Sequence, residues 1–298
     1  MSFSDRTRPL DPRHRSFFAL AIGMVAGIVC WWARVTVGAG SPGDFVQVLY
    51  PAQALLRGSD PLAIFYEGYV PYPLTAALLG LPFAGLPLAV GSGLLAGLAA
   101  ALLAYMLLAE GQLWRLLLFG SFPFFYALVF AQFTPLITAL ALAGCAPLGM
   151  LLKPQNALPL LLTYPSQRWS FVAAGLIVAG SLLLRPTWPL VWIERAREYS
   201  GAIPMLVLPG PLLALALLRW RSPRARQLLL MACMPQRSYY DAVALWLIPQ
   251  TRGGMLVLTL CSWLALLFPH LPLMLLACYL PALAVLLWEG RVAPATPR

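Results

Sequence analysis

Charged side chains are scarce in this sequence. Only 10% of its 298 residues are charged, whereas 61% are hydrophobic, and an ordinary soluble domain carries about 25% charged residues. A soluble fold of this length needs a polar outer surface, and the polar residues here are too few to cover one. The composition therefore excludes a soluble domain and predicts an integral membrane protein.

The sequence has only one lysine and two histidines, and its cysteines form no recognisable motif. The net charge of +10 rests on arginines between apolar runs, which the positive-inside rule explains, so nucleic acid is not an expected partner. The five cysteines show no CxxC spacing, and no Walker, GxSxG, HExxH or dinucleotide motif occurs. ATP hydrolysis, serine hydrolysis and zinc chemistry are disfavoured, and no metal or cofactor is expected.

Long apolar runs fill the chain instead. The run from Ser16 to Val37 is long enough to span, at about 20 residues, so it is expected to be a retained first helix rather than a signal peptide. Because 28 prolines and 23 glycines interrupt the later runs, some of these helices should break inside a bundle. The sequence predicts one all-α transmembrane domain over residues 1–298, a polytopic helical bundle of about ten membrane segments. After the first, these are 73–90, 92–109, 113–131, 133–150, 154–164, 170–187, 203–219, 226–248, 254–268 and 271–288.

Arginine placement predicts the orientation. Four arginines lie in the tail 1–15 and four lie between residues 219 and 226, so both segments are expected in the cytoplasm. The stretch 38–72 then becomes an outward-facing first loop with a short interfacial helix, and 192–200 also lies outside. The C-terminal tail 289–298 returns inside if the 226–248 run enters and leaves as a broken pair around Pro235.

Three polar places interrupt the apolar pattern. Asp44, just beyond the first helix, either caps a short helix or acts as a general base. Lys153, the only lysine, either reaches the interface or holds an anionic phosphate. The segment Pro235 to Asp241 is either a plain loop or a re-entrant segment that brings Arg237 to a shared pocket.

Short motifs follow one another in three stretches. The first contains Gly43-Asp44-Phe45, Arg57-Gly58-Ser59-Asp60-Pro61 and Tyr69-Val70-Pro71-Tyr72-Pro73. The second is Ala131-Gln132-Phe133-Thr134-Pro135, followed by Lys153-Pro154-Gln155, and the third is Pro235 to Asp241. Together they resemble the GT-C superfamily of membrane glycosyltransferases, specifically bacterial enzymes that use polyprenyl-phosphate sugars such as polyprenyl-phosphomannose.

This resemblance implies a GT-C-like fold at the bacterial inner membrane. The expected activity moves a sugar, mannose or another hexose, from a polyprenyl phosphate to an extracytoplasmic acceptor. Asp44 would deprotonate the acceptor, and Lys153 and Arg237 would contact the lipid phosphate. The implied substrate pocket adds Gln132, Gln155, Tyr72, Tyr239, Tyr240, Asp241, Arg57 and Asp60.

Two other functions remain open from the sequence. One is a catalytically inactive GT-C-like subunit of a membrane complex, and the other is a lipid or sugar transporter. Membrane lipids are expected partners under each of them, and the resemblance implies no metal.

Overall fold

The computed structural model describes residues 10–36, 43–63, 72–197, 201–267 and 274–292, and every regular element in these ranges is a helix. One isolated β-bridge joins Ala202 to Gln236. The α-helices are α1 (Pro12–Thr36), α2 (Val46–Leu56), α3 (Leu74–Gly80), α4 (Leu88–Leu107), α5 (Phe122–Val129), α6 (Thr134–Leu142), α7 (Ala146–Met150), α8 (Pro154–Leu161), α9 (Arg168–Leu184), α10 (Trp188–Ala196), α11 (Pro223–Cys233), α12 (Arg252–Ser262) and α14 (Leu280–Val292). The 3₁₀ segments are η2 (Leu81–Phe83), η3 (Leu108–Glu110), η4 (Leu113–Gly120), η5 (Pro204–Leu206), η6 (Gly210–Arg219), η7 (Tyr239–Leu247) and η8 (Trp263–Leu267), and a π-helical segment, η9 (Leu275–Tyr279), leads into α14.

Proline explains why many apolar runs fold as short helices. A proline occupies the first turn of α5, α6, α7, α8, α10 and α11. At that position the missing N–H is not needed by the helix, and the fixed φ suits its start. The predicted segment 133–150 is therefore α6 followed by α7, and 226–248 breaks around Pro235 into α11 and η7.

Two helices are long and apolar enough to cross a membrane, namely α1 and the Leu88–Glu110 helix that contains α4. α9 and α10 meet the same criterion only as a pair, and they are bent by 101°. These helices indicate a membrane protein with two or three candidate spans in the described part of the chain. The expectation of about ten membrane segments stays a prediction.

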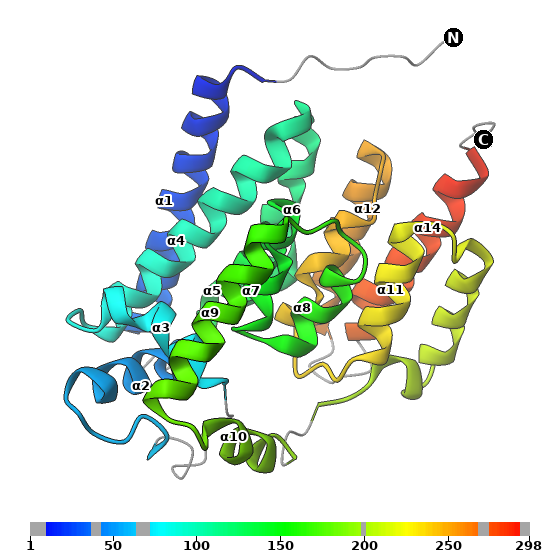
Figure 1. Ribbon diagram of the computed structural model, residues 1–298. Coiled ribbons are helices and arrows are strands. Elements are labelled where there is room, and N and C mark those ends of the chain that lie inside the picture. The colour runs from blue at the N-terminus through cyan, green and yellow to red at the C-terminus, as the bar shows by residue number, and fades with distance from the viewer. Residues whose placement is uncertain (1–9, 37–42, 64–71, 198–200, 268–273, 293–298) are drawn as a thin grey trace.

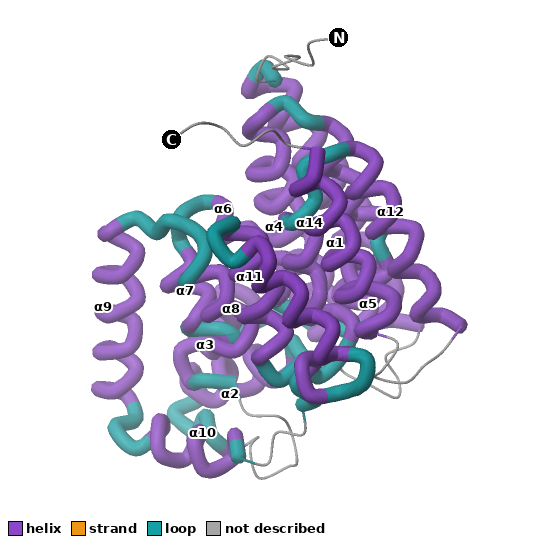
Figure 2. Tube along the Cα trace, turned by 90° about the vertical axis from the view of Figure 1, so that its right-hand side faces the viewer, coloured by secondary structure: helices purple, strands orange, loops and turns teal. Residues whose placement is uncertain are grey.

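The arrangement is a bundle with one helix at its margin. Figure 1 shows α1 and α4 side by side at one flank, α11 and α14 at the other, and α10 across one end. The first turn of α1 and the last turn of α14 lie at the opposite end (Figure 1). α9 stands at the edge of the bundle (Figure 2) and buries only Ser170 and Ser181, while Leu183 is 87% exposed. Its apolar surface is the kind that faces lipid.

Two glycine pairs bring the backbones of α1 and α4 into contact. Gly23 and Gly27 on α1 face Gly97 and Gly93 on α4 in antiparallel order, so that a methyl group on Gly97 would lie 2.9 Å from the carbonyl oxygen of Gly23. Both sequences have the GxxxG spacing that lets membrane helices pack closely through small residues. This packing leaves no space for a larger side chain at the crossing.

A small apolar cluster holds the first loop and α10 against α3. Leu62, Leu74, Ala77 and Trp188 are its buried members. Burying these side chains away from water stabilises the contact between segments far apart in the sequence. As a result α10 is fixed at the end of the bundle where the cavity described below is found.

Substituting leucine for Gly97 should destabilise the protein, because the side chain would push α4 away from α1. Overpacking of this kind costs roughly 1–3 kcal/mol. The thermal midpoint of the protein in detergent should fall for Gly97→Leu. Gly175→Leu is the matched control, since Gly175 lies in the middle of α9 with no atom within 4 Å of an added Cβ, and equal losses for both variants would contradict this packing.

Candidate functional site

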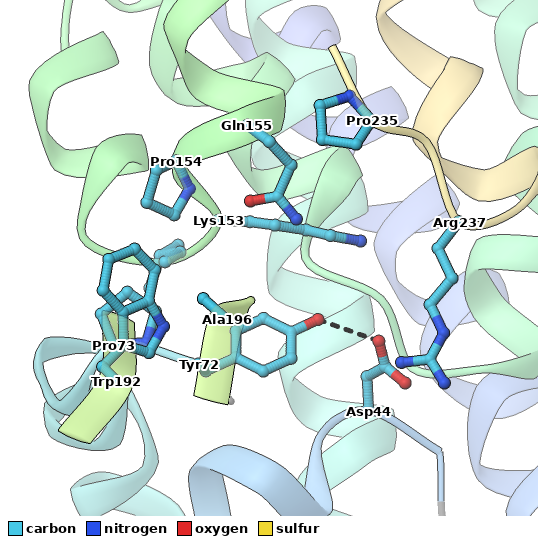
Figure 3. A pocket seen from close by; sticks show the side chains of 11 residues that line it. Asp44, Tyr72, Pro73, Lys153, Pro154, Gln155, Trp192, Ala196, Pro235 and Arg237 are labelled. Atoms are coloured by element: carbon cyan, nitrogen blue, oxygen red, sulfur yellow. Dashed lines mark hydrogen bonds between the residues drawn. The ribbon is translucent and has the colours of Figure 1, made fainter. Parts of the chain in front are cut away.

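A cavity of about 220 Å³ opens at the end of the bundle that α10 covers. Its walls come from the turn after α1, the start of α3, the start of α8, α10 and the loop after α11. The lining residues are Asp44, Tyr72, Pro73, Leu152, Lys153, Pro154, Gln155, Trp192, Ala196, Pro235 and Arg237. Figure 3 shows that the Asp44 carboxylate and the Arg237 guanidinium face one another in it.

Asp44 is held by its backbone and by its carboxylate. Its N–H donates to the carbonyl oxygen of Phe130 at 2.9 Å, and the Tyr72 hydroxyl donates to its Oδ2 at 2.9 Å. Gly43 before it adopts φ +72°, and a Cβ there would lie 2.9 Å from the backbone carbonyl oxygen of Phe130. Glycine is thus required at this turn both by its left-handed backbone and by the close approach of that carbonyl.

The turn that accepts the hydrogen bond from the Asp44 backbone N–H follows α5. Ala131 has φ 50°, and the hydrogen bonds Gln132 N to Ala127 O and Ala131 N to Leu128 O form a Schellman ending. Alanine is uncommon in this left-handed conformation, which suits glycine, and such strain is concentrated at functional sites. The turn directs the Phe130 carbonyl to Asp44 and the Gln132 side chain to Lys153.

Lys153 and Asp241 form a buried ion pair behind the cavity. Lys153 Nζ lies 2.7 Å from Asp241 Oδ1, and the two residues are 4% and 1% exposed. The Asn156 amide also donates to Oδ1, at 2.6 Å, and the Gln132 oxygen lies 3.5 Å from Nζ. A lysine and a carboxylate withdrawn from water must be compensated in this way to remain ionised.

Arg237 enters the cavity from the loop between α11 and η7. The backbone N–H of Arg237 donates to Asp241 Oδ2 at 2.9 Å. The neighbouring residue Gln236 pairs with Ala202 through two backbone hydrogen bonds of 2.9 and 2.7 Å. The side chain itself is exposed and points toward Asp44 (Figure 3). The loop backbone is therefore fixed, while the guanidinium remains accessible.

Nine of the eleven predicted site residues lie in or near the cavity and fall into three groups. Asp44, Tyr72, Lys153, Gln155 and Arg237 line the cavity together. Gln132, Tyr240 and Asp241 lie behind it against Lys153, whose Nζ is 4.7 Å from the centre of the Tyr240 ring. Tyr239 packs edge-on against Phe122 and Tyr126.

Arg57 and Asp60 do not belong with the others. Neither is among the described residues that line the cavity, and Asp60 instead pairs with Arg185 at 2.9 Å on the surface. They were expected in the pocket because the resemblance to the glycosyltransferase superfamily implied it through the motif that contains them. Tyr69, the partner of Tyr72 in the motif, lies outside the described residues.

Some wall residues carried no sequence signal. Trp192 and Ala196 reach the cavity because α10 turns back across the end of the bundle. Asn156, which completes the ion pair, lies one turn into α8 and follows Lys153 by three residues. That spacing places the two side chains on one side of the helix start and is the one local feature that could have suggested Asn156.

In the described part of the chain no three His, Cys, Asp or Glu side chains gather as a metal site would require. Comparison with protein-family models, curated proteins and solved structures finds no match for this chain. The assignment of function therefore rests on the cavity itself.

Tyr72 should stabilise the protein through its bond to Asp44. Burial, and to a lesser degree the negative charge of Asp44, raises the pKa of Tyr72 well above its ordinary value of 10.0. A hydrogen bond to a charged group contributes roughly 1.5–3 kcal/mol, so Tyr72→Phe should unfold at lower temperature than the wild type at pH 7.

The pH dependence of this difference has a defined sign. The folded state binds the Tyr72 proton more tightly than the unfolded state, so its contribution is complete below about pH 10 and declines as pH rises above it. Thermal scans of wild type and Tyr72→Phe should converge there. Tyr50→Phe is the control because Tyr50 is 43% exposed, and an equal effect of both substitutions would refute the role of the Asp44 contact.

Proposed function

We propose that this protein is a membrane glycosyltransferase that moves a sugar from a polyprenyl-phosphate donor to an acceptor at the extracytoplasmic face of a bacterial inner membrane. The observation that carries the proposal is the cavity in which a carboxylate, Asp44, faces a guanidinium, Arg237. A base for an acceptor hydroxyl and a cation for a leaving phosphate are the two groups that such a transfer needs.

Asp44 suits the part of the base. Tyr72 occupies Oδ2, which orients the carboxylate and leaves Oδ1 for the acceptor hydroxyl. In the proposed reaction the hydroxyl proton passes to Asp44 as the acceptor oxygen forms a bond to the anomeric carbon. The bond from that carbon to the phosphate oxygen breaks, and its electron pair stays with the phosphate.

Arg237 suits the part of the cation. Its guanidinium is accessible in the cavity, and a planar fork of donors matches the oxygens of a phosphate. The negative charge that grows on the leaving phosphate would be stabilised by it. Lys153 also borders the cavity, but its charge is already compensated by Asp241.

The size and walls of the cavity favour a lipid-linked donor. A volume of about 220 Å³ is below the roughly 300 Å³ at which pockets begin to enclose drug-sized molecules. In the proposed complex only the sugar and phosphate head group enters the cavity, while the polyprenyl chain stays in the bilayer. Leu152, Trp192 and the neighbouring prolines supply the apolar surface next to that chain.

Asp44→Asn should reduce sugar transfer by about 100-fold or more, since general-base catalysis contributes roughly 10²–10⁴-fold. The measurement is the formation of labelled product from a polyprenyl-phosphate hexose by purified protein in lipid vesicles. Glu110→Gln removes the same charge from a side chain that is 64% exposed and away from the cavity lining, and it should leave the rate unchanged. An unchanged rate for Asp44→Asn in a folded protein would remove Asp44 as the base.

The product should have the inverted anomeric configuration. Asp44 is the only carboxylate among the described residues of the cavity wall, so no second one is provided to form a covalent sugar intermediate, and a single displacement inverts the carbon. Proton NMR of the product gives its configuration directly. Retention would contradict the direct displacement, and a wild type that transfers no sugar but copurifies with stoichiometric membrane partners would favour the inactive subunit instead.

A further inference from the structure

Asp241 is a buried acid at the rear of the cavity that accepts three hydrogen bonds. Its Oδ1 accepts from Lys153 Nζ at 2.7 Å and from the Asn156 amide at 2.6 Å, and its Oδ2 accepts from the backbone N–H of Arg237 at 2.9 Å. These bonds join the start of α8 to the loop after α11, which lie more than 80 positions apart in the sequence. Asp241 does not line the cavity itself.

The bonds divide the two cations of the cavity wall into different roles. Lys153 is 4% exposed and forms an ion pair with Asp241. Arg237, in contrast, takes part in none of the ion pairs found among the described residues. Two of the three N–H donors of Lys153 face Asp241 and Gln132, and its positive charge is already compensated by the Asp241 carboxylate. An incoming anion therefore meets Arg237 as the accessible positive charge.

We propose that Asp241 is a positioning residue: with Lys153 as its counter-charge, it fixes the backbone of Arg237 so that the guanidinium projects into the cavity and binds the phosphate. Lys153 serves the binding site through Asp241 and does not contact the ligand. This inference rests on the proposed function for the identity of the anion, a polyprenyl monophosphate. The positioning of the Arg237 backbone by Asp241 is independent of the proposed function.

A double-mutant cycle separates positioning from direct contact. Lys153→Met and Asp241→Asn, made singly, each leave one buried charge without its partner, and each should weaken binding of decaprenyl monophosphate by at least about tenfold. Together they remove both charges, and the amide oxygen that replaces the carboxylate still accepts from the N–H of Arg237. The double variant should therefore bind within about threefold of wild type. Affinity is measured by titrating the lipid into protein in nanodiscs.

Arg237→Gln tests the direct contact between the guanidinium and the phosphate. It should abolish measurable binding in the wild-type and in the double-variant background alike, while the thermal midpoint stays close to that of the parent. A double variant as weak as Lys153→Met alone would mean that Lys153 touches the phosphate, and it would overturn the proposal.

Trypsin gives a readout that needs no ligand. The bond after Arg237 is protected if Asp241 fixes the loop, so each single variant should be cleaved there at least about tenfold faster than wild type, and the double variant at close to the wild-type rate. Mass spectrometry identifies the cut. If wild type fails to bind the lipid phosphate, the proposed function fails, and the cleavage rates still decide the role of Asp241; equal rates in all four proteins would reject it.

Discussion

The ion pair between Lys153 and Asp241 is the interaction on which the site depends. A lysine and a carboxylate that are almost fully buried need each other and further hydrogen-bond partners, because an unpaired charge in a low-dielectric interior is very costly. The structure meets this demand with Asn156, Gln132 and the backbone of Arg237. Satisfying one buried pair thus brings the start of α8, the turn after α5 and the loop after α11 to one place.

The same turn after α5 connects this pair to Asp44. Its Gln132 side chain approaches Lys153, and its Phe130 carbonyl receives the Asp44 N–H. The strained backbone of Ala131 lies between the two. One short segment therefore holds the candidate base on one side and contacts the buried ion pair on the other.

The helices around the site are divided between those that pack tightly and those that face outward. α1 and α4 approach through glycines, while α9 leaves most of its surface exposed. Such a contrast is expected where lipid, rather than water, surrounds the protein, since exposed apolar side chains then carry no penalty. α10 turns across the end of α9 and contributes Trp192 to the cavity, so the site is situated where the bundle ends.

The sequence by itself determined the helical class, the apolar character and the break around Pro235, because composition and proline positions act locally. It also pointed to Asp44, Lys153 and Arg237, since isolated charges in apolar surroundings are expensive and rarely incidental. Only the tertiary structure decided that Lys153 is paired, that Arg57 and Asp60 lie away from the cavity, and that α10 forms part of its wall. Those facts depend on contacts between segments far apart in the chain, whose distances and partners no local pattern encodes.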